Sequence, residues 1–487
     1  MKKTFIILCL SCLSFALSAQ DGITLHFMRL NPYSTYSNPS AFTQYTGYVG
    51  IPGISNINVA LTNTGIHYKT LFGTNNDGTI TTIKLNNFAD KLNKKGNYLN
   101  SNIALNIINF GFKVHKLRFD FSYRIRVDEY FSYNRDLIAL PVHGNIYYAN
   151  QNKQATPELK LNLNCYQEFA LGIQAEITPQ VYIGVKPKLL FGLAHAKTKN
   201  ASASIFTDPE NYSIALDYNL DANISCVMPY TITSDTNNKL GFQFYPDQFA
   251  KHWQDAFKNV GAAIDLGVTY RINDQFGIAA SVLDLGFIHW KTNNYKISGH
   301  SSDANDGSFV FDGLSSEDIE LLKENPEEFK NVLLSHFPMQ IQETKAFTSA
   351  LAGRFILEGY CNVGKYHRFT ALFQGRIVNS QFMPSFTVAW NGTFLNIFDL
   401  CVSYSIAKKS YTNLGVGVGF NLGVFHLYAA TDNLIAICTN KNPLQSLMNA
   451  SNANIQMGIV FDWGKLQEEQ LAKIKYEKSS KRVRYEE

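Results

Sequence analysis

Charged residues recur at alternate positions between residues 118 and 128, and their types allow two kinds of chemistry. Each alternates with an apolar residue, so the polar side chains share one face of an extended strand and the apolar ones share the other. Facing a water-filled interior, the arginines could form a cation-rich constriction that favours anionic solutes. Alternatively, they pair with carboxylates on neighbouring strands. The charged residues of this face are Arg118, Asp120, Arg124, Arg126 and Asp128.

The sequence contains none of the motifs that identify common catalytic or nucleotide sites. It has no Gly-x-Ser-x-Gly elbow, no His-Glu-x-x-His, no P-loop and no cluster of cysteine and histidine. Of seven cysteines, Cys9 and Cys12 lie near the N-terminus, and the remaining odd, scattered set argues against a disulfide framework. We therefore expect no enzyme, no metal site and no cofactor. The formal charge of +4 gives no reason to expect nucleic-acid binding.

The strand that carries these charges is long, and similar strands follow it. Alternation runs unbroken over residues 117–128, whereas a soluble strand has about 5–6 residues and a membrane-spanning one about 9–11. Charged residues make up 17% of the chain, below the roughly 25% of soluble domains. We predict an all-β fold, a transmembrane antiparallel β-barrel of about 14 strands over residues 49–463. Further alternating files lie within residues 159–177, 181–193, 212–224, 264–272, 414–422 and 455–461.

Two other architectures are disfavoured. A soluble β-helix or propeller would show a repeat of fixed length, and none is found. A helical membrane protein needs a run of about 20 apolar residues, and no segment after the N-terminus approaches it.

Glycines alternate with valines from Gly415 to Gly419. The valines keep the strand alternation and no helix follows, so a nucleotide-binding loop is excluded. Glycines on the inward face of a strand let another backbone approach the wall closely. We expect a plug in the lumen to pack on Gly415, Gly417 and Gly419; relief of crowding and local strand curvature are the alternatives.

The two ends of the chain differ from the wall. Residues 1–19 are interpreted as a signal peptide, because Lys2 and Lys3 precede an apolar stretch too short to span a bilayer. Residues 20–48 lack strand periodicity, and we expect them to form an N-terminal hatch or plug. Residues 465–487 form a charged C-terminal tail, which is either solvated or docks a periplasmic partner.

Two interruptions of the strand region predict short helical insertions. Residues 247–260 carry Phe249, Trp253 and Phe257 at four-residue spacing, which suits an amphipathic helix. Residues 293–337 predict a long helical insertion or loop, in which Ser315 to Asp318 resembles a capping box. This insertion could lie outside the barrel or fold into its lumen.

Asn38 and Pro39 lie ahead of the first strands and are followed by Ser40 and Ala41. The stretch resembles the Asn-Pro-Ala-like sequences that outer-membrane barrels of the FadL superfamily often show at this point, and three further stretches resemble the same superfamily. Together these stretches look like an uncharacterised, domain-of-unknown-function branch of Bacteroidota outer-membrane proteins. The three further stretches that carry the resemblance are residues 263–270 (Ala-Ile-Asp-Leu-Gly-Val-Thr-Tyr), 282–290 (Val-Leu-Asp-Leu-Gly-Phe-Ile-His-Trp) and 428–433 (Tyr-Ala-Ala-Thr-Asp-Asn).

The resemblance implies a 14-stranded barrel in the outer membrane of a Gram-negative bacterium, with a luminal hatch at Asn38 and Pro39 and both termini in the periplasm. Superfamily members carry hydrophobic compounds across the outer membrane. Related barrels serve type IX secretion as accessory proteins. The chain departs from the transporter pattern at Ser40, where alanine is usual. We thus expect a plugged barrel in outer-membrane lipid that moves a small hydrophobic ligand; the alternative is an accessory or scaffold barrel that acts through secretion-system or periplasmic partners.

Overall fold

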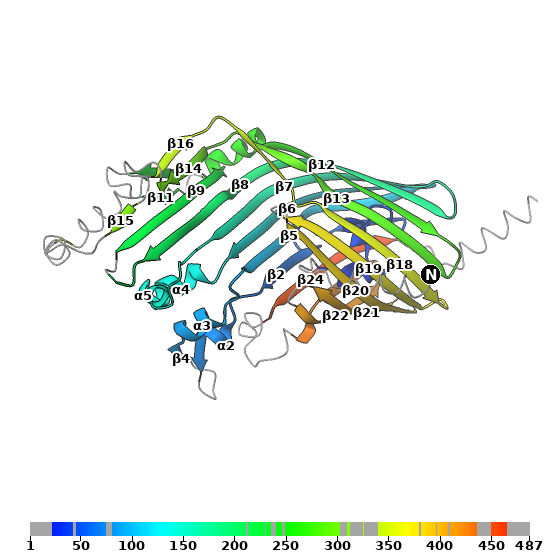
Figure 1. Cartoon of the computed structure of the whole chain (residues 1–487). Coiled ribbons are helices and arrows are strands. Elements are labelled where there is room, and N and C mark those ends of the chain that lie inside the picture. Colours follow the sequence, from blue (N-terminus) through cyan, green and yellow to red (C-terminus); the bar gives the residue numbers. More distant parts are fainter. Residues whose placement is uncertain are drawn as a thin grey trace, which may run out of the picture.

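The computed structural model describes most of the chain between residues 22 and 464 (Figure 1). The predicted signal peptide and the predicted C-terminal tail lie outside the described residues, as do the predicted capping box and helices between residues 315 and 334. The described ranges are 22–41, 45–74, 80–210, 213–228, 230–234, 240–245, 249–301, 309–311, 325, 339–378, 381–395, 397–407, 410–435 and 450–464.

The wall is a closed antiparallel barrel with 14 strand positions, as predicted. Strands β1 and β2 occupy one position together, because both pair with β5 on one side and with β24 on the other, which closes the barrel. In order, the strands are β1 (Gly47–Gly50) and β2 (Ile57–Asn63), β5 (Asn97–Val114), β6 (Leu117–Tyr133), β7 (Leu159–Glu176), β8 (Val181–Thr207), β12 (Val260–Arg271), β13 (Phe276–Trp290), β18 (Arg354–Val363), β19 (His367–Val378), β20 (Gln381–Phe394), β21 (Phe398–Ala407), β22 (Ser410–Leu422), β23 (Phe425–Thr431) and β24 (Asn452–Trp463).

Side chains alternate across this wall as the sequence predicts. On β6 the even-numbered side chains from Arg118 to Tyr130 are buried, and the odd-numbered apolar ones are half-buried or exposed on the outer face. Apolar side chains such as Leu171, Ile278 and Phe369 are about half exposed on other strands. Because a closed barrel pairs every strand edge, its backbone can lie in hydrocarbon without unsatisfied polar groups.

The two ends of the barrel differ. Short turns join β5 to β6, β7 to β8, β12 to β13, β18 to β19, β20 to β21 and β22 to β23, and they lie at one end, here called the hairpin end. The wall also begins and finishes there, since the Thr46 N–H donates to Trp463 O at 3.1 Å. The longer connections lie at the opposite end, here called the loop end, although β19 and β20, and likewise β21 and β22, are joined there by two residues.

Additional elements gather at the loop end (Figure 1). The part of β8 at the loop end, from Ala194 to Thr207, extends beyond the barrel and pairs with β9. Strand β9 pairs in turn with β14 and β15. The bounds of these elements are α2 (Tyr68–Leu71), β3 (Phe72–Thr74), β4 (Ile80–Ile83), α3 (Leu85–Lys91), α4 (Asp136–His143), α5 (Ile146–Ala149), β9 (Ile214–Cys226), β10 (Tyr230–Ser234), β11 (Leu240–Phe244), α6 (Phe249–His252), η4 (Trp253–Lys258), β14 (Asn294–His300), β15 (Phe309–Phe311), β16 (Gln340–Glu343) and β17 (Phe347–Ala350). No helix among the described residues is long and apolar enough to cross a membrane.

Three sequence predictions need correction here. The file at residues 212–224 lies in β9, outside the barrel wall, because alternation identifies a strand but not the sheet that it joins. The insertion at residues 293–337 is partly strand, since 294–300 and 309–311 pair with β9. The predicted helix at 247–260 is short: α6 and η4 cover residues 249–258, and β12 begins at Val260.

Residues 22–41 lie inside the barrel and form two short 3-10 helices, η1 (Thr24–Phe27) and η2 (Pro32–Tyr36). Asn31 caps η2, because its side chain accepts a hydrogen bond from the Tyr33 N–H, and Pro32 follows at the first helical position. We call residues 22–41 the luminal segment. The first wall strand begins at Gly47, two residues before the predicted boundary.

Candidate functional site

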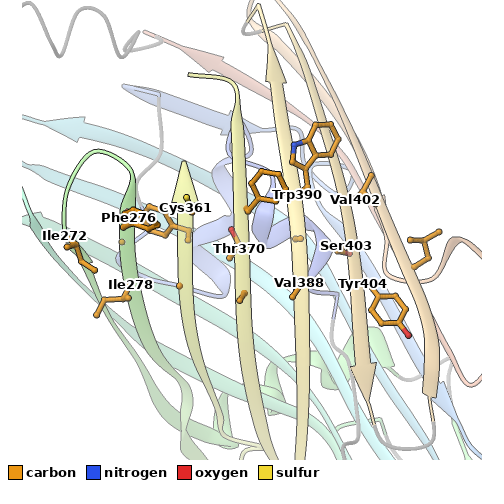
Figure 2. A pocket seen from close by; sticks show the side chains of 17 residues that line it. Ile272, Phe276, Ile278, Cys361, Thr370, Val388, Trp390, Val402, Ser403 and Tyr404 are labelled. Atoms are coloured by element: carbon orange, nitrogen blue, oxygen red, sulfur yellow. The ribbon is translucent and has the colours of Figure 1, made fainter. Parts of the chain in front are cut away.

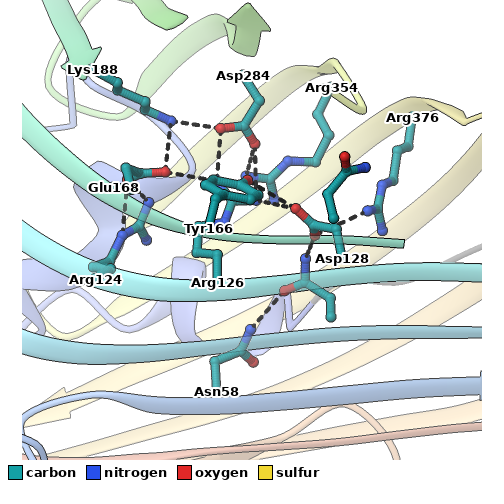
Figure 3. A network of polar contacts seen from close by, with 12 residues as sticks. Asn58, Arg124, Arg126, Asp128, Tyr166, Glu168, Lys188, Asp284, Arg354 and Arg376 are labelled. Atoms are coloured by element: carbon teal, nitrogen blue, oxygen red, sulfur yellow. Dashed lines mark hydrogen bonds and ion pairs between the residues drawn. The ribbon is translucent and has the colours of Figure 1, made fainter. Parts of the chain in front are cut away.

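A layer of buried ion pairs crosses the lumen at mid-height of the wall (Figure 3). Figure 3 shows charged side chains from opposite sides of the barrel converging on one another. We call this set the ion layer. It consists of Arg124, Arg126, Asp128, Glu168, Lys188, Asp265, Asp284, Arg354 and Arg376.

Arg126 lies at the centre of the ion layer. Its Nη1 is 2.9 Å from Glu168 Oε2 and 2.8 Å from Asp284 Oδ1, and its Nη2 is 3.3 Å from Asp128 Oδ2. The guanidinium also lies over the Tyr166 ring, whose hydroxyl donates to Asp128 at 2.9 Å. One cation therefore holds carboxylates from β6, β7 and β13 together.

Lys188 is the second cation of the ion layer that contacts several carboxylates. Its Nζ is 2.7 Å from Asp265 Oδ2, 2.6 Å from Asp284 Oδ1 and 3.7 Å from Glu168 Oε2. Asp284 reaches the lumen because the register between β12 and β13 shifts at this point and Asp284 has a φ of 58°. As a result, the consecutive side chains of Leu283 and Asp284 are both buried. Buried charges are tolerated only when they are paired, and here each carboxylate has a cationic partner.

The structure brings four of the five predicted charged residues into ion pairs with other strands. Arg124 and Arg126 contact Glu168 of β7, and Asp128 contacts Arg376 Nη2 at 3.3 Å. Asp120 lies nearer the hairpin end, 2.8 Å from Lys186 Nζ. Arg118 is also buried, and its guanidinium lies 5.5 Å from the centre of the Tyr48 ring.

The luminal segment packs on the hairpin side of the ion layer. The Arg124 guanidinium lies 4.1 Å from the centre of the Tyr36 ring, and the Asn106 side chain donates to the Tyr36 hydroxyl at 2.8 Å. Burial raises the pKa of the Tyr36 phenol to about 12, although Arg124 opposes this shift. The cavity between the segment, the ion layer and β2 has a volume of only about 60 Å³.

Two wall aspartates hold the backbone of the luminal segment. Asp432 accepts hydrogen bonds from the N–H groups of Ile23 at 3.0 Å and Thr24 at 2.8 Å. Asp399 accepts one from the Leu30 N–H at 3.2 Å. Sequence reasoning did not identify either carboxylate as an anchor, although Asp432 belongs to the 428–433 stretch.

The predicted hatch residues Asn38 and Pro39 lie against β8 and β12. The Asn38 side chain donates to Thr269 Oγ1 at 3.3 Å and accepts from the Ser40 N–H at 3.0 Å. A Cβ atom at Gly267 would come within 3.0 Å of the Pro39 ring, and one at Gly184 would collide with the Pro39 carbonyl. Sequence reasoning missed both glycines, since each is isolated in its strand.

The predicted glycine stripe faces η1. A Cβ atom at Gly417 would come within 2.7 Å of Met28 Sδ, and one at Gly419 within 3.2 Å of Met28 Cε. At Gly415 it would collide with the hydroxyl groups of Ser403 and Thr24. The missing side chains thus leave room for the luminal segment to approach β22.

Apolar side chains line the wall on the loop side of the ion layer. On β6, β8 and β19 they occupy the next inward position: Tyr130 follows Asp128, Leu190 follows Lys188, and Val378 follows Arg376. We call this set the apolar layer. It comprises Tyr98, Tyr130, Val378 and Met383 in one cluster and Tyr166, Leu190, Ala263, Ile288 and Trp290 in another.

A closed barrel with an apolar outer face and a lumen filled by its own N-terminal segment belongs to the class of membrane-spanning β-barrels. Within that class the chain belongs to the family of unknown function DUF5723, whose model matches residues 39–432. No curated protein sequence matches the chain significantly.

Several solved outer-membrane barrels are similar to the chain over nearly its whole length. The toluene transporter TbuX of Ralstonia pickettii has a TM-score of 0.42 at 9% identity, covering 93% of this chain and 97% of that one. A FadL homologue of Pseudomonas aeruginosa has a TM-score of 0.41 at 9% identity, covering 92% and 100%. The toluene transporter TodX of Pseudomonas putida has a TM-score of 0.39 at 9% identity, covering 93% and 99%.

Proposed function

We propose that the chain is an outer-membrane transporter that moves a small hydrophobic compound, with residues 22–41 as its hatch. The observation that carries this proposal is the apolar layer, which occupies inward positions of the wall. The interior of a water-filled pore is polar. An apolar interior surface instead suits a ligand that gains free energy by leaving water.

The layers give the ligand an ordered path. It enters at the loop end, which faces outward in this proposal, and binds at the apolar layer beside residues such as Trp290 and Met383. The ion layer and the luminal segment then separate the ligand from the periplasm, which lies at the hairpin end in this proposal.

Passage requires the luminal segment to move. Ligand pockets have volumes of about 300–1,000 Å³, whereas the cavity beside His26, Tyr36 and Arg124 has about 60 Å³. The segment is held by side-chain contacts, both hydrogen bonds to the wall and a buried apolar cluster that includes Ile23, Leu25 and Met28, and not by a continuous strand pairing. Contacts of this kind can be exchanged one at a time.

The accessory role in a secretion system remains the other class of function. It would depend on a protein partner, whereas the apolar layer and the luminal segment lie inside the barrel, where a transported ligand would pass.

Uptake of a hydrophobic dye tests the proposal. Gram-negative cells that express the full chain should take up N-phenylnaphthylamine faster than cells without it. The variant Met383→Glu should abolish the gain, because it introduces a charge into the apolar layer. The control Gln340→Glu changes an exposed residue of β16 and should leave uptake unchanged. Equal uptake with and without the protein would contradict the proposal, provided that heat-dependent gel mobility shows a folded barrel.

A further inference from the structure

The lipid-facing side of the wall carries an apolar groove that is separate from the lumen. It has a volume of about 850 Å³ and crosses six neighbouring strands, from β13 through β18, β19, β20 and β21 to β22 (Figure 2). Its floor follows one row of paired residues across the sheet. That row is Ile278, Gly359, Ala371, Val388, Tyr404 and Leu414.

Gly359 makes this row concave. A Cβ atom placed there would have nothing within 4 Å, and its φ lies outside the left-handed region. Neither crowding nor backbone conformation therefore requires glycine at this position, and glycine weakens a strand interior. The neighbouring Ala371 is also small, whereas Phe276, Phe369 and Trp390 lie in the next outward-facing row of paired residues, along one side of the groove floor.

The length and slope of the groove match one leaflet of a bilayer. Six strands at spacings of about 4.8 Å give a length of about 24 Å. With the strands tilted by about 45°, the groove covers about 17 Å along the membrane normal, close to half of the roughly 30 Å hydrocarbon core. It begins at Phe276, the first residue of β13, and reaches Leu414 well inside β22, so it rises from the hairpin end.

An aromatic pair lies beside the hairpin side of the groove. Trp390 stacks on His367 with ring centres 5.8 Å apart. Tryptophan marks the membrane–water interface in membrane proteins. The pair therefore marks the hairpin side of the groove as the side nearer the headgroups.

We propose that the groove is a binding site for one acyl chain of a diacyl phospholipid in the leaflet at the hairpin end. Its apolar lining excludes a polar ligand, its dimensions fit one chain in one leaflet, and the barrel wall places it in lipid. The proposal requires only that the barrel lies in a membrane and is independent of transport through the lumen.

Quenching of Trp390 fluorescence by brominated lipid tests the site. We would replace Trp253 and Trp463 by phenylalanine in the full chain, which leaves the luminal Trp290 as an internal reference, and titrate detergent micelles with phosphatidylcholine that carries dibrominated acyl chains. Gly359→Phe fills the open space and should raise the lipid fraction for half-maximal quenching about tenfold, which corresponds to about 1.4 kcal/mol. Ala262→Phe adds the same side chain to the outer face of β12, away from the groove, and should leave the curve unchanged.

Identical quenching curves for the parent and Gly359→Phe would overturn the proposal, since the lipid would then bind no more tightly than any lipid at the wall. A curve that shifts with protein concentration, together with a disulfide-linked dimer through Cys361, would also overturn it, because a second copy of the chain would then cover the groove. Heat-dependent gel mobility establishes that each variant is folded.

Discussion

Replacing Lys188 by methionine should destabilise the barrel strongly, and the reason lies in Asp265. Lys188 is the only cation that the described residues place within 4 Å of the Asp265 carboxylate, which is 1% exposed. Glu168 and Asp284 keep arginine partners when Lys188 is removed, whereas Asp265 keeps none. Removing one partner of a buried pair costs about 3–5 kcal/mol, because the other charge stays buried.

A double-mutant cycle separates this cost from the loss of packing. Lys188→Met should lower the free energy of unfolding by about 3–5 kcal/mol. Adding Asp265→Asn should recover at least about 2 kcal/mol of that loss, since no uncompensated carboxylate remains. The control Lys160→Met removes a lysine that is about half exposed and pairs with Glu158, so its cost should stay below about 1 kcal/mol.

Urea unfolding of the barrel in lipid vesicles measures these differences. A loss below about 1 kcal/mol for Lys188→Met would refute the reasoning, because it would place the ion layer in water rather than in a buried layer. Additive effects of the two substitutions would refute it as well, since they would show that Lys188 and Asp265 do not interact.

Two further predictions concern the luminal segment. Gly417→Leu places a side chain where Met28 lies, so it should either open the lumen to ions or destabilise the fold by about 1–3 kcal/mol. The control Val416→Leu changes a residue on the outer face and should do neither. Planar-bilayer conductance and urea unfolding measure the two effects. The raised pKa of Tyr36 favours the neutral phenol in the folded chain, so the free energy of unfolding should fall as pH rises from about 10 to 12. The fall should be smaller in Tyr36→Phe. If the phenol were exposed, urea unfolding at several alkaline pH values would show the same fall in both proteins.

The wall could be predicted from sequence because its signal is local. Each strand alternates with a period of two, and the inward position of Arg126 or Asp128 follows from that period alone. The glycine stripe on β22 could be identified for the same reason, since three glycines on one face leave a gap that the sequence shows directly. The structure puts Met28 into that gap.

The partners of these residues could not be predicted, because they depend on closure of the barrel. Arg376 lies 248 residues from Asp128 in sequence, and no local pattern links the two strands. Asp284 breaks the alternation of β13, so a regular period places it wrongly. The anchors Asp399 and Asp432 become visible only when the luminal segment lies inside the wall.

Single-channel conductance in a planar bilayer tests the central claim, that residues 22–41 close the lumen. The unaltered chain should be silent, and a variant in which Asp399 and Asp432 are both changed to alanine should conduct in discrete steps, because the segment loses the acceptors of its backbone N–H groups. Heat-dependent gel mobility of the same samples shows that both are folded. Steady conductance of the unaltered chain, equal to that of the variant, would contradict the account.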